Sequence, residues 1–438
     1  MKTKCSEKTR PGDQAQIEPA VCKLAAVPNG AAGIRVEQYL IFFLVCIVSL
    51  TFFHAPGTSD VNIWGAWINN ARQMGIVNGY AANGRDYPPL STVILFMVFK
   101  ASDFLHINAF SGFKLSLFIF LVFSSLLFAV WSKDVTLASV LLLSLVMNSM
   151  ALGYLDIYFA PALIIAFWAL EKEKLTLAMV FFILSCMIKW QPLILAPFIA
   201  LYGLKRENIK DLKGADLKRL FLSAGLPCLG AVFLFPWIFG SEIFRAFNRA
   251  TSHAYLSGNA LNFNWILTHF LHVFSPERFG PLKNGLAEYI MTKDVSITLL
   301  PRFLFFAFYA ATLLMFFKQK KTFANLVLFS LSGYLAYCIF NTGVHENHFF
   351  LACILVIMLY WTDRSHLRTL LAVVVCANLN LFIFYGIRGD GLPFNRVIGV
   401  DLALIISIVN VIFFFMVFSS AVKIFRDRRW EISRCPSV

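Results

Sequence analysis

The sequence predicts an all-α polytopic membrane protein with about twelve transmembrane helices and interfacial helices in its first outer loop. Of its 438 residues, 59% are hydrophobic, 14% are charged and 47 are phenylalanine, whereas charged residues make up roughly 25% of an average soluble protein. Uncharged runs such as Leu220–Gly240 recur along the chain, and roughly 20 helical residues cross the ~30 Å of hydrocarbon in a bilayer. These runs show no alternating strand pattern. Because lipid provides no hydrogen-bond partner for backbone N–H and C=O groups, we expect the runs to be helices.

Twelve of these runs are predicted to be spans. They cover residues 38–55, 114–131, 135–151, 156–170, 175–189, 191–204, 220–240, 301–317, 322–341, 347–361, 369–387 and 401–422. Leu90–Phe99 is too short for a crossing and is expected to lie at the interface or to re-enter the membrane. If this segment is left out and the N-terminus lies inside, the basic segments all face the cytoplasm, as the positive-inside rule requires. Those segments are 205–219, 318–321, 363–368 and 423–429.

The predicted topology divides the chain into five regions. They are a disordered cytoplasmic tail (1–37), a first transmembrane module (38–240) that contains the first outer loop (56–113), a large outer loop (241–300), a second transmembrane module (301–424) and a basic cytoplasmic tail (425–438). The net charge of +14 follows from this topology, and we expect no nucleic-acid partner. Six of the nine cysteines lie in apolar runs without CxxC spacing, which is typical of core residues rather than disulfides.

The first outer loop begins with TSDVNIWGAW (58–67), in which a lone acid, Asp60, precedes two tryptophans. Val61, Trp64 and Ile68 fall on one side of a predicted helix along the membrane interface, where we expect Trp64 and Trp67 to be anchors. Two interpretations of Asp60 stay open on local grounds. It is either a helix N-cap or a general base at the membrane face.

The same loop closes with GRDYPPLS (84–91). Its two prolines require an extended turn, because each removes a backbone donor and restricts the residue before it. Asp86 and Tyr87 are candidate substrate-binding residues. Alternatively, Asp86 only pairs with Arg85 at the level of the headgroups.

A third polar motif, NTGVHENHFF (341–350), lies at the outer end of a predicted span. Ionisable residues at membrane depth are functional candidates by default, so His345, Glu346 and His348 are candidate binding residues. The spacing of the two histidines is not that of HExxH, and no third metal ligand is indicated. Binding of an anionic group by His345 is therefore favoured over a metal site.

Further polar residues fall on the same predicted face of the membrane. They are Asp156, Lys189 and Gln191 near the ends of short spans, and Arg245, Arg249 and Asn262 in the large outer loop. Each alone would be an ordinary interfacial group. Their convergence with Asp60 and His345 suggests one site.

A base, several cations and aromatic side chains at a lipid boundary suit an enzyme whose donor is a lipid with a phosphate leaving group. The base would deprotonate an acceptor hydroxyl. The cations and a histidine would stabilise charge on the departing phosphate.

The motifs resemble those of the GT-C glycosyltransferases, membrane enzymes that use polyprenyl-phosphate sugars. The similarity is greatest to the dolichyl-phosphate-glucose glucosyltransferases of N-glycan assembly and to their bacterial relatives. It rests on Asp60 at the start of the first outer loop, on Asp86-Tyr87-Pro88-Pro89-Leu90, and on Val344-His345-Glu346, with Ala260-Leu261-Asn262-Phe263 similar to an ANF-type segment.

The resemblance implies an inverting transfer of one hexose, glucose or mannose, to a lipid-linked or glycan acceptor, with Asp60 as base and His345 near the donor phosphate. It implies no nucleotide cofactor, and a divalent metal stays as an alternative. The expected location is a bacterial inner membrane, with the site facing outward and both termini in the cytoplasm.

Three other interpretations stay open at this stage. The first is a transporter or flippase for a lipid-linked glycan, which should carry ionisable residues near mid-membrane and paired broken helices. The others are an assembly protein without chemistry and a transferase of oligosaccharides. The clustering of ionisable residues at one face favours a single-sugar enzyme.

Overall fold

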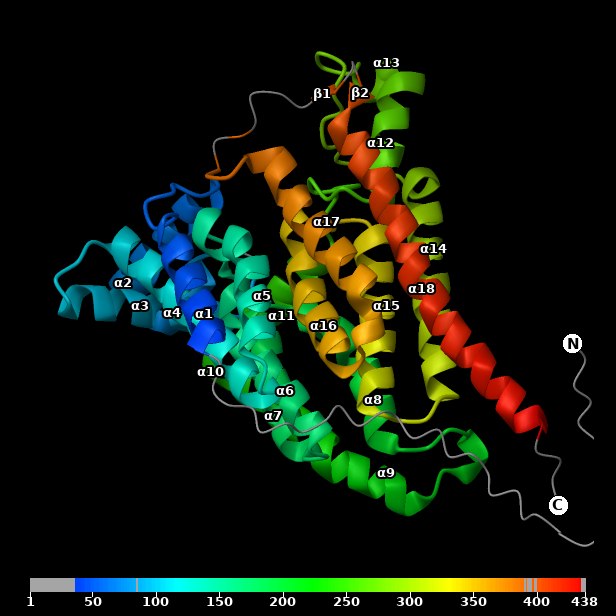
Figure 1. The fold of residues 1–438 in the computed structure, drawn as a ribbon. Helices are drawn as coiled ribbons and strands as arrows, with labels where there is room; N and C mark the ends of the chain where they lie inside the picture. Colours follow the sequence, from blue (N-terminus) through cyan, green and yellow to red (C-terminus); the bar gives the residue numbers. More distant parts are fainter. Residues whose placement is uncertain (1–35, 84–85, 390, 392–395, 398–399, 435–438) are drawn as a thin grey trace, which may run out of the picture. The chain divides into compact units, whose positions relative to one another are not determined.

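Most of the chain folds into a bundle of apolar helices (Figure 1). The computed structural model describes residues 36–83, 86–389, 391, 396–397 and 400–434. Residues Gln38–Val438 form one unit, and Met1–Glu37 form another, of which only the last two residues are described. The predicted tail at 1–37 therefore lies almost wholly outside the described residues.

The first outer loop is helical. It follows α1 (Val36–Leu50) and contains α2 (Asp60–Asn83) and α3 (Pro89–Phe104) before α4 (Ala109–Ser132) begins. The helix α2 is broken at Gly75, whose φ of 79° favours glycine. Pro89 begins α3 at a position where no backbone donor is needed. The segment Leu90–Phe99, which was expected not to cross, lies within α3 and packs beside α2 and α4.

The middle of the chain forms short helices joined by tight turns. They are α5 (Val135–Val146), the π-turn η1 (Met147–Ala151), the 3-10 turn η2 (Leu155–Tyr158), α6 (Ala160–Glu171), α7 (Leu175–Ile188), η3 (Gln191–Leu195), α8 (Ala196–Leu204), η4 (Ile209–Asp211), α9 (Gly214–Leu220), η5 (Phe221–Gly225) and α10 (Leu226–Phe239). The outer side chains of α10 are exposed, including Phe233 at 72% and Trp237 at 83%. Exposed apolar surface of this extent is expected where a helix faces lipid.

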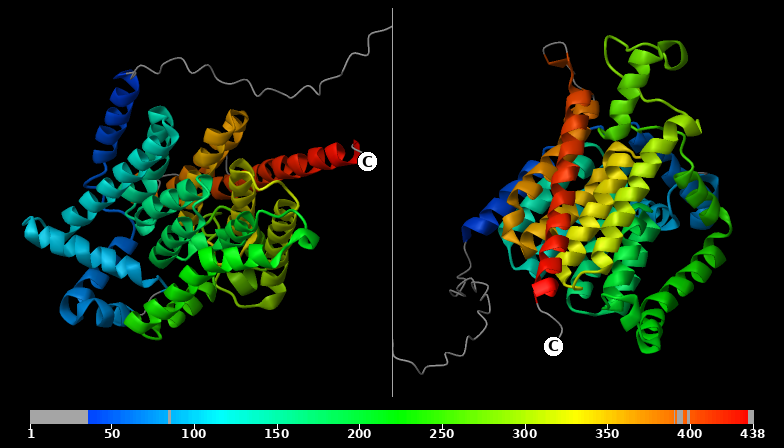
Figure 2. Two further views of the ribbon diagram at one scale, coloured as in Figure 1. Left: turned by 90° about the horizontal axis from the view of Figure 1, so that it is seen from below. Right: turned by 90° about the vertical axis from the view of Figure 1, so that its right-hand side faces the viewer.

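The large outer loop and the last helices complete the unit. They are α11 (Glu242–Thr251), α12 (Phe263–Phe274), α13 (Pro276–Phe279), α14 (Val295–Phe317), α15 (Phe323–Phe340), η6 (Glu346–His348), α16 (Phe349–Thr362), η7 (Arg364–His366), α17 (Leu367–Tyr385), the paired strands β1 (Arg396–Val397) and β2 (Val400–Asp401), and α18 (Leu402–Arg434). Helices α15 and α16 are almost wholly buried and form the core. Figure 2 shows α12 and α13 beyond one end of the bundle, and Figure 1 shows α9 at the other end.

The structure supports a membrane protein and six of the predicted spans by length and composition. In the described part of the chain, the helices long and apolar enough to cross a membrane are 109–132, 214–239, 295–317, 323–340, 364–385 and 402–427. Six shorter apolar helices cover 36–50, 135–151, 160–171, 175–188, 191–204 and 346–362. These twelve segments match the predicted runs in position, but a count of twelve spans is not confirmed. Helix α18 continues to Arg434, through most of the segment 425–438 that is predicted to be a basic tail.

Candidate active site

The polar motifs singled out in the sequence meet where the start of α2 approaches the turns on either side of η2 and η6. Tight backbone bonds hold the start of α2 there, since Thr58 N–H donates to the Leu152 carbonyl at 3.0 Å. The indole of Trp64 donates to the Gly153 carbonyl at 3.0 Å. The first turn of α2 is therefore fixed to the turn that carries Asp156.

Asp60 is the first residue of α2 and is only partly exposed. Burial, and then the neighbouring Glu346 carboxylate, raise the pKa of Asp60 to about 6, although Lys189 and His345 act to lower it. Among the described residues, no backbone amide or side chain hydrogen-bonds the Asp60 carboxylate, so the N-cap interpretation finds no support. The pKa of Asp60 is therefore close to neutral pH, and a general base is most effective when its pKa is near the working pH.

A chain of three hydrogen-bonding side chains runs beside Asp60. The Asp86 carboxylate accepts from Nε2 of His253 at 2.8 Å, and Nδ1 of His253 lies 3.1 Å from Nε2 of His345. Which of the two rings donates in this second contact depends on the protonation of each ring, since a neutral imidazole has one donor and one acceptor and a protonated one has two donors. The bond to His253 holds the pKa of Asp86 below its usual value, against the effect of burial.

His345 is held by the large outer loop. Gly258 N–H donates to the Val344 carbonyl at 2.8 Å, and Glu346 N–H donates to the Gly258 carbonyl at 3.2 Å. The backbone of Gly258 lies so close to the imidazole that a Cβ there would be 2.5 Å from Nδ1 of His345. Burial and the neighbouring His253 lower the pKa of His345 to about 4, so its ring is neutral at pH 7.

Glu346 is buried, and one of its carboxylate oxygens accepts two hydrogen bonds. Its Oε1 accepts from the Tyr154 hydroxyl at 2.5 Å and from the Tyr385 hydroxyl at 3.2 Å. Its backbone carbonyl accepts from the amide of Asn380 at 3.1 Å. Glu346 therefore adds negative charge near Asp60 while its own position is fixed.

Asp156 and Lys189 form a buried ion pair. Nζ of Lys189 lies 2.6 Å from Oδ1 of Asp156, and Oδ2 accepts from the amide of Asn347 at 3.2 Å. The same ammonium lies 5.3 Å from the ring centroid of Tyr87, within reach of a cation–π contact.

Tyr87 packs edge to face against two tryptophans of α2. Its ring centroid lies 5.4 Å from those of Trp64 and Trp67. Both indoles are buried, at 2% and 3% exposure, so the prediction that they anchor α2 in the membrane interface was wrong. They pack within the protein because Tyr87 and the Gly153 turn cover them.

The remaining predicted residues lie outside this cluster or behind it. Arg245 pairs with Glu242 on an exposed face of α11, and Arg249 lies 3.6 Å from the same carboxylate. Asn262 is fully buried and caps α12, with its amide donating to the Cys338 carbonyl at 2.9 Å, which is a structural role. His348 lies behind His345, 3.0 Å from the Tyr337 hydroxyl. Gln191 is buried at the start of η3, and no described residue hydrogen-bonds its side-chain amide.

Sequence reasoning missed His253, which links the first outer loop to the His345 motif. His253 begins the stretch HAYLSGNALNFNWIL (253–267), which is rich in amide and aromatic groups, but nothing in its spacing singles out the histidine. Tyr154 and Asn347 were missed as well, although Tyr154 lies two residues before Asp156 and Asn347 lies within the motif 341–350. The sequence signal that could have found them is their position within or near a polar motif, because a buried carboxylate needs hydrogen-bond donors close by.

No group of three or more histidine, cysteine or acidic side chains with the geometry to hold a metal ion occurs among the residues that the structure describes. The chain matches no model of a known protein family, and it has no match among curated proteins.

Proposed function

We propose that the protein is a membrane glycosyltransferase that moves a single hexose from a polyprenyl-phosphate donor to a hydroxyl of a lipid-linked or glycan acceptor. The observation that carries the proposal is Asp60, an unpaired carboxylate whose pKa is raised to about 6 beside a pair of partly buried histidines. The membrane would be a bacterial inner membrane, with the site at its outer face.

Asp60 would act as the general base. At pH 7 a carboxylate of this pKa is mostly ionised, yet it binds a proton more strongly than an ordinary aspartate. It would accept the proton of the acceptor hydroxyl as that oxygen attacks the anomeric carbon of the hexose. The bond between that carbon and the phosphate oxygen would break with inversion, and the electron pair would leave with the phosphate.

The histidine pair would bind the phosphate of the donor. Both imidazoles can take up a proton, and a nearby anion raises the pKa of a histidine. The ring of His345, which is neutral at pH 7, would therefore bind a proton more strongly when the phosphate is bound. Asp86 would support the cationic form of His253, since their 2.8 Å contact becomes an ion pair on protonation.

The test is transfer by purified Asp60→Asn with a labelled polyprenyl-phosphate hexose and candidate acceptors. Loss of a general base is expected to lower the rate about 10² to 10⁴-fold. Asp103→Asn, at an exposed position near the end of α3, is the matched control and should retain full activity. Because Asp60 has a raised pKa, the folded state favours its protonated form, so the neutral Asn is expected not to lower the Tm at pH 7. Undiminished transfer by Asp60→Asn would contradict the assignment.

A transporter for lipid-linked glycans is the second candidate function. The buried pair of Asp156 and Lys189 is the observation that favours it, because ionisable groups within a membrane protein often line a substrate path. Detergent-solubilised protein has no compartments between which a lipid could be moved. Glycosylated product formed in detergent would support the enzyme, and its absence with all donor and acceptor pairs tested would favour the transporter.

A further inference from the structure

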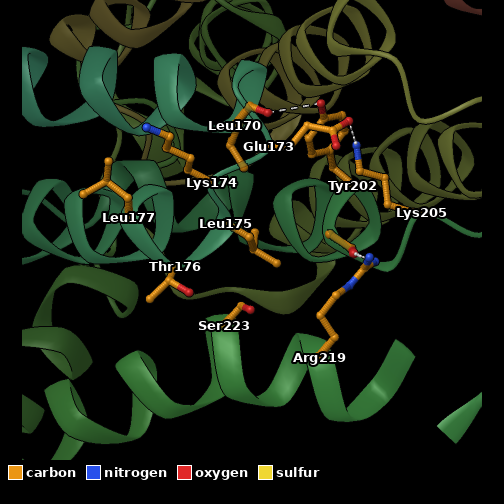
Figure 3. A pocket seen from close by; sticks show the side chains of 11 residues that line it. Leu170, Glu173, Lys174, Leu175, Thr176, Leu177, Tyr202, Lys205, Arg219 and Ser223 are labelled. Carbon is orange, nitrogen blue, oxygen red and sulfur yellow. Dashed lines mark hydrogen bonds and ion pairs between the residues drawn. The ribbon is translucent and has the colours of Figure 1, made fainter. Parts of the chain in front are cut away.

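A polar cleft separate from the candidate active site lies where the turn after α6 and the first turn of α7 meet the end of α8 and helix α9. It has a volume of about 440 Å³, within the roughly 300–1,000 Å³ of ligand pockets. Its lining includes Lys174, Leu175, Leu177, Lys205, Arg219 and Ser223 (Figure 3). Helix α6 has 12 residues and runs from the turn that carries Asp156 to this cleft, so the two sites are separated by about 18 Å of helix.

The cleft carries more positive than negative charge. Lys205 lies 2.8 Å from the exposed carboxylate of Glu173, and its ammonium lies 4.4 Å from the ring centroid of Tyr202. Nη2 of Arg219 donates to the Gly203 carbonyl at 2.9 Å, which uses one of the five N–H donors of the guanidinium. With Lys174, three cations thus face one acid. Figure 3 shows Lys205 and Arg219 on one side of the opening and Lys174 on the other.

Exposed apolar side chains border these cations. Leu177, which lines the cleft, is 44% exposed at the start of α7. Phe221 and Leu222 are 53% and 50% exposed in η5, between the lining residues Arg219 and Ser223. A basic opening next to an exposed apolar surface matches the two parts of a phospholipid, an anionic headgroup and an acyl chain. A soluble phosphate would use the cations alone.

We propose that this cleft binds the phosphate headgroup of an anionic phospholipid, with one acyl chain along Leu177 and Leu222. Arg219 and Lys205 contact the phosphate oxygens, and Ser223 is placed to donate a hydroxyl. The cleft lies beside the segment 205–219, which has six basic and three acidic residues. Such juxtamembrane basic segments attract anionic lipids. This proposal is independent of the proposed hexose transfer.

The test is titration of the full-length protein in neutral detergent with dioleoyl phosphatidylglycerol, followed by native mass spectrometry. The triple variant Lys174→Gln, Lys205→Gln, Arg219→Gln is expected to bind at least about tenfold more weakly. A matched triple at exposed basic positions elsewhere, Lys133→Gln, Arg368→Gln, Lys423→Gln, should change binding less than about twofold, because it removes the same charge without touching the cleft.

Two further arms separate a lipid site from other causes. The charge-retaining triple Lys174→Arg, Lys205→Arg, Arg219→Lys should keep binding, which excludes a general loss of folding as the reason for weakening. Glycerol 3-phosphate and phosphatidylcholine should fail to displace the bound phosphatidylglycerol. Equal weakening by the two neutralising triples, or displacement by glycerol 3-phosphate at the concentration of the lipid, would overturn the proposal.

Discussion

The candidate active site and the basic cleft hold their charges in opposite ways. In the site, Asp86 is bonded to His253, Asp156 to Lys189 and Glu346 to two tyrosines, and all of these groups are largely shielded from solvent. In the cleft, three cations face one acid, and Lys174, Glu173 and Arg219 are exposed. A buried charge without a partner is costly, whereas an exposed one is solvated by water. The unpaired Asp60 is therefore unusual among the paired charges of the candidate active site. In the basic cleft, the surplus cations can attract an anionic ligand.

The largest expected effect comes from breaking the buried ion pair. Lys189→Met leaves the Asp156 carboxylate in the protein interior without its cation, which is expected to lower the free energy of unfolding by about 3–5 kcal/mol. The measurement is denaturant titration in mixed micelles. Lys205→Met breaks the exposed pair with Glu173 and should change stability by about 0–1 kcal/mol. Equal losses in the two variants would remove the distinction between the two regions.

The next effect comes from the close contact at His345. Gly258→Ala places a methyl group where the imidazole lies, so the ring or the loop must shift, at an expected cost of about 1–3 kcal/mol. Gly230→Ala in α10 is the control, because a Cβ there meets nothing within 4 Å and the substitution favours helix. If Gly258→Ala has a Tm equal to that of Gly230→Ala, the packing of Gly258 on His345 is not tight in solution.

A smaller effect tests the electrostatics of the histidine chain. His253 lowers the pKa of His345 and Asp86 raises it, so His253→Gln should shift the titration of His345 upward. Asp86→Asn should shift it downward. The measurement is NMR of protein labelled at the histidine Cε1 positions, and shifts of the same sign in both variants would contradict the arrangement.

The smallest effect concerns the acid of the basic cleft. Glu173→Gln frees Lys205 from its exposed ion pair and should change the free energy of unfolding by less than about 1 kcal/mol. The same change should tighten phosphatidylglycerol binding by about threefold, because the net positive charge of the cleft rises by one. Glu277→Gln, on exposed α13, is the control, and weaker lipid binding by Glu173→Gln would argue against a headgroup at this place.

The positions of the apolar helices could be predicted almost completely from the sequence. In an apolar run the backbone groups find no partners in lipid, so they must hydrogen-bond to one another as a helix. All twelve predicted segments therefore coincide with apolar helices. The number that cross a membrane was less predictable, since segments such as 191–204 are short and end in turns. The burial of Trp64 and Trp67 depended on Tyr87 and on the Gly153 turn, which helical periodicity does not reveal.

The candidate site could be predicted in part. Asp60, Asp86, His345 and Lys189 were grouped because predicted topology put them on one face, and the structure brings them together. Arg245 and Arg249 share that loop but pair with Glu242 on α11. His253 was beyond reach, because its role rests on a contact with a residue 92 positions later in the chain.

The bond between His253 and His345 also has a consequence for synthesis. Asp60 and His345 are 285 residues apart in the chain. At translation rates of about 5–20 residues per second, His345 is synthesised roughly 15–60 s after Asp60. By the end of that interval α2, the Asp86 turn and the buried acid Asp156 are made, while His345, Glu346 and Asn347 are not. A chain released just before residue 345 thus contains Asp86 and Asp156 with their partners His253 and Lys189. It lacks His345, which completes the histidine chain, and Asn347, which also donates to Asp156.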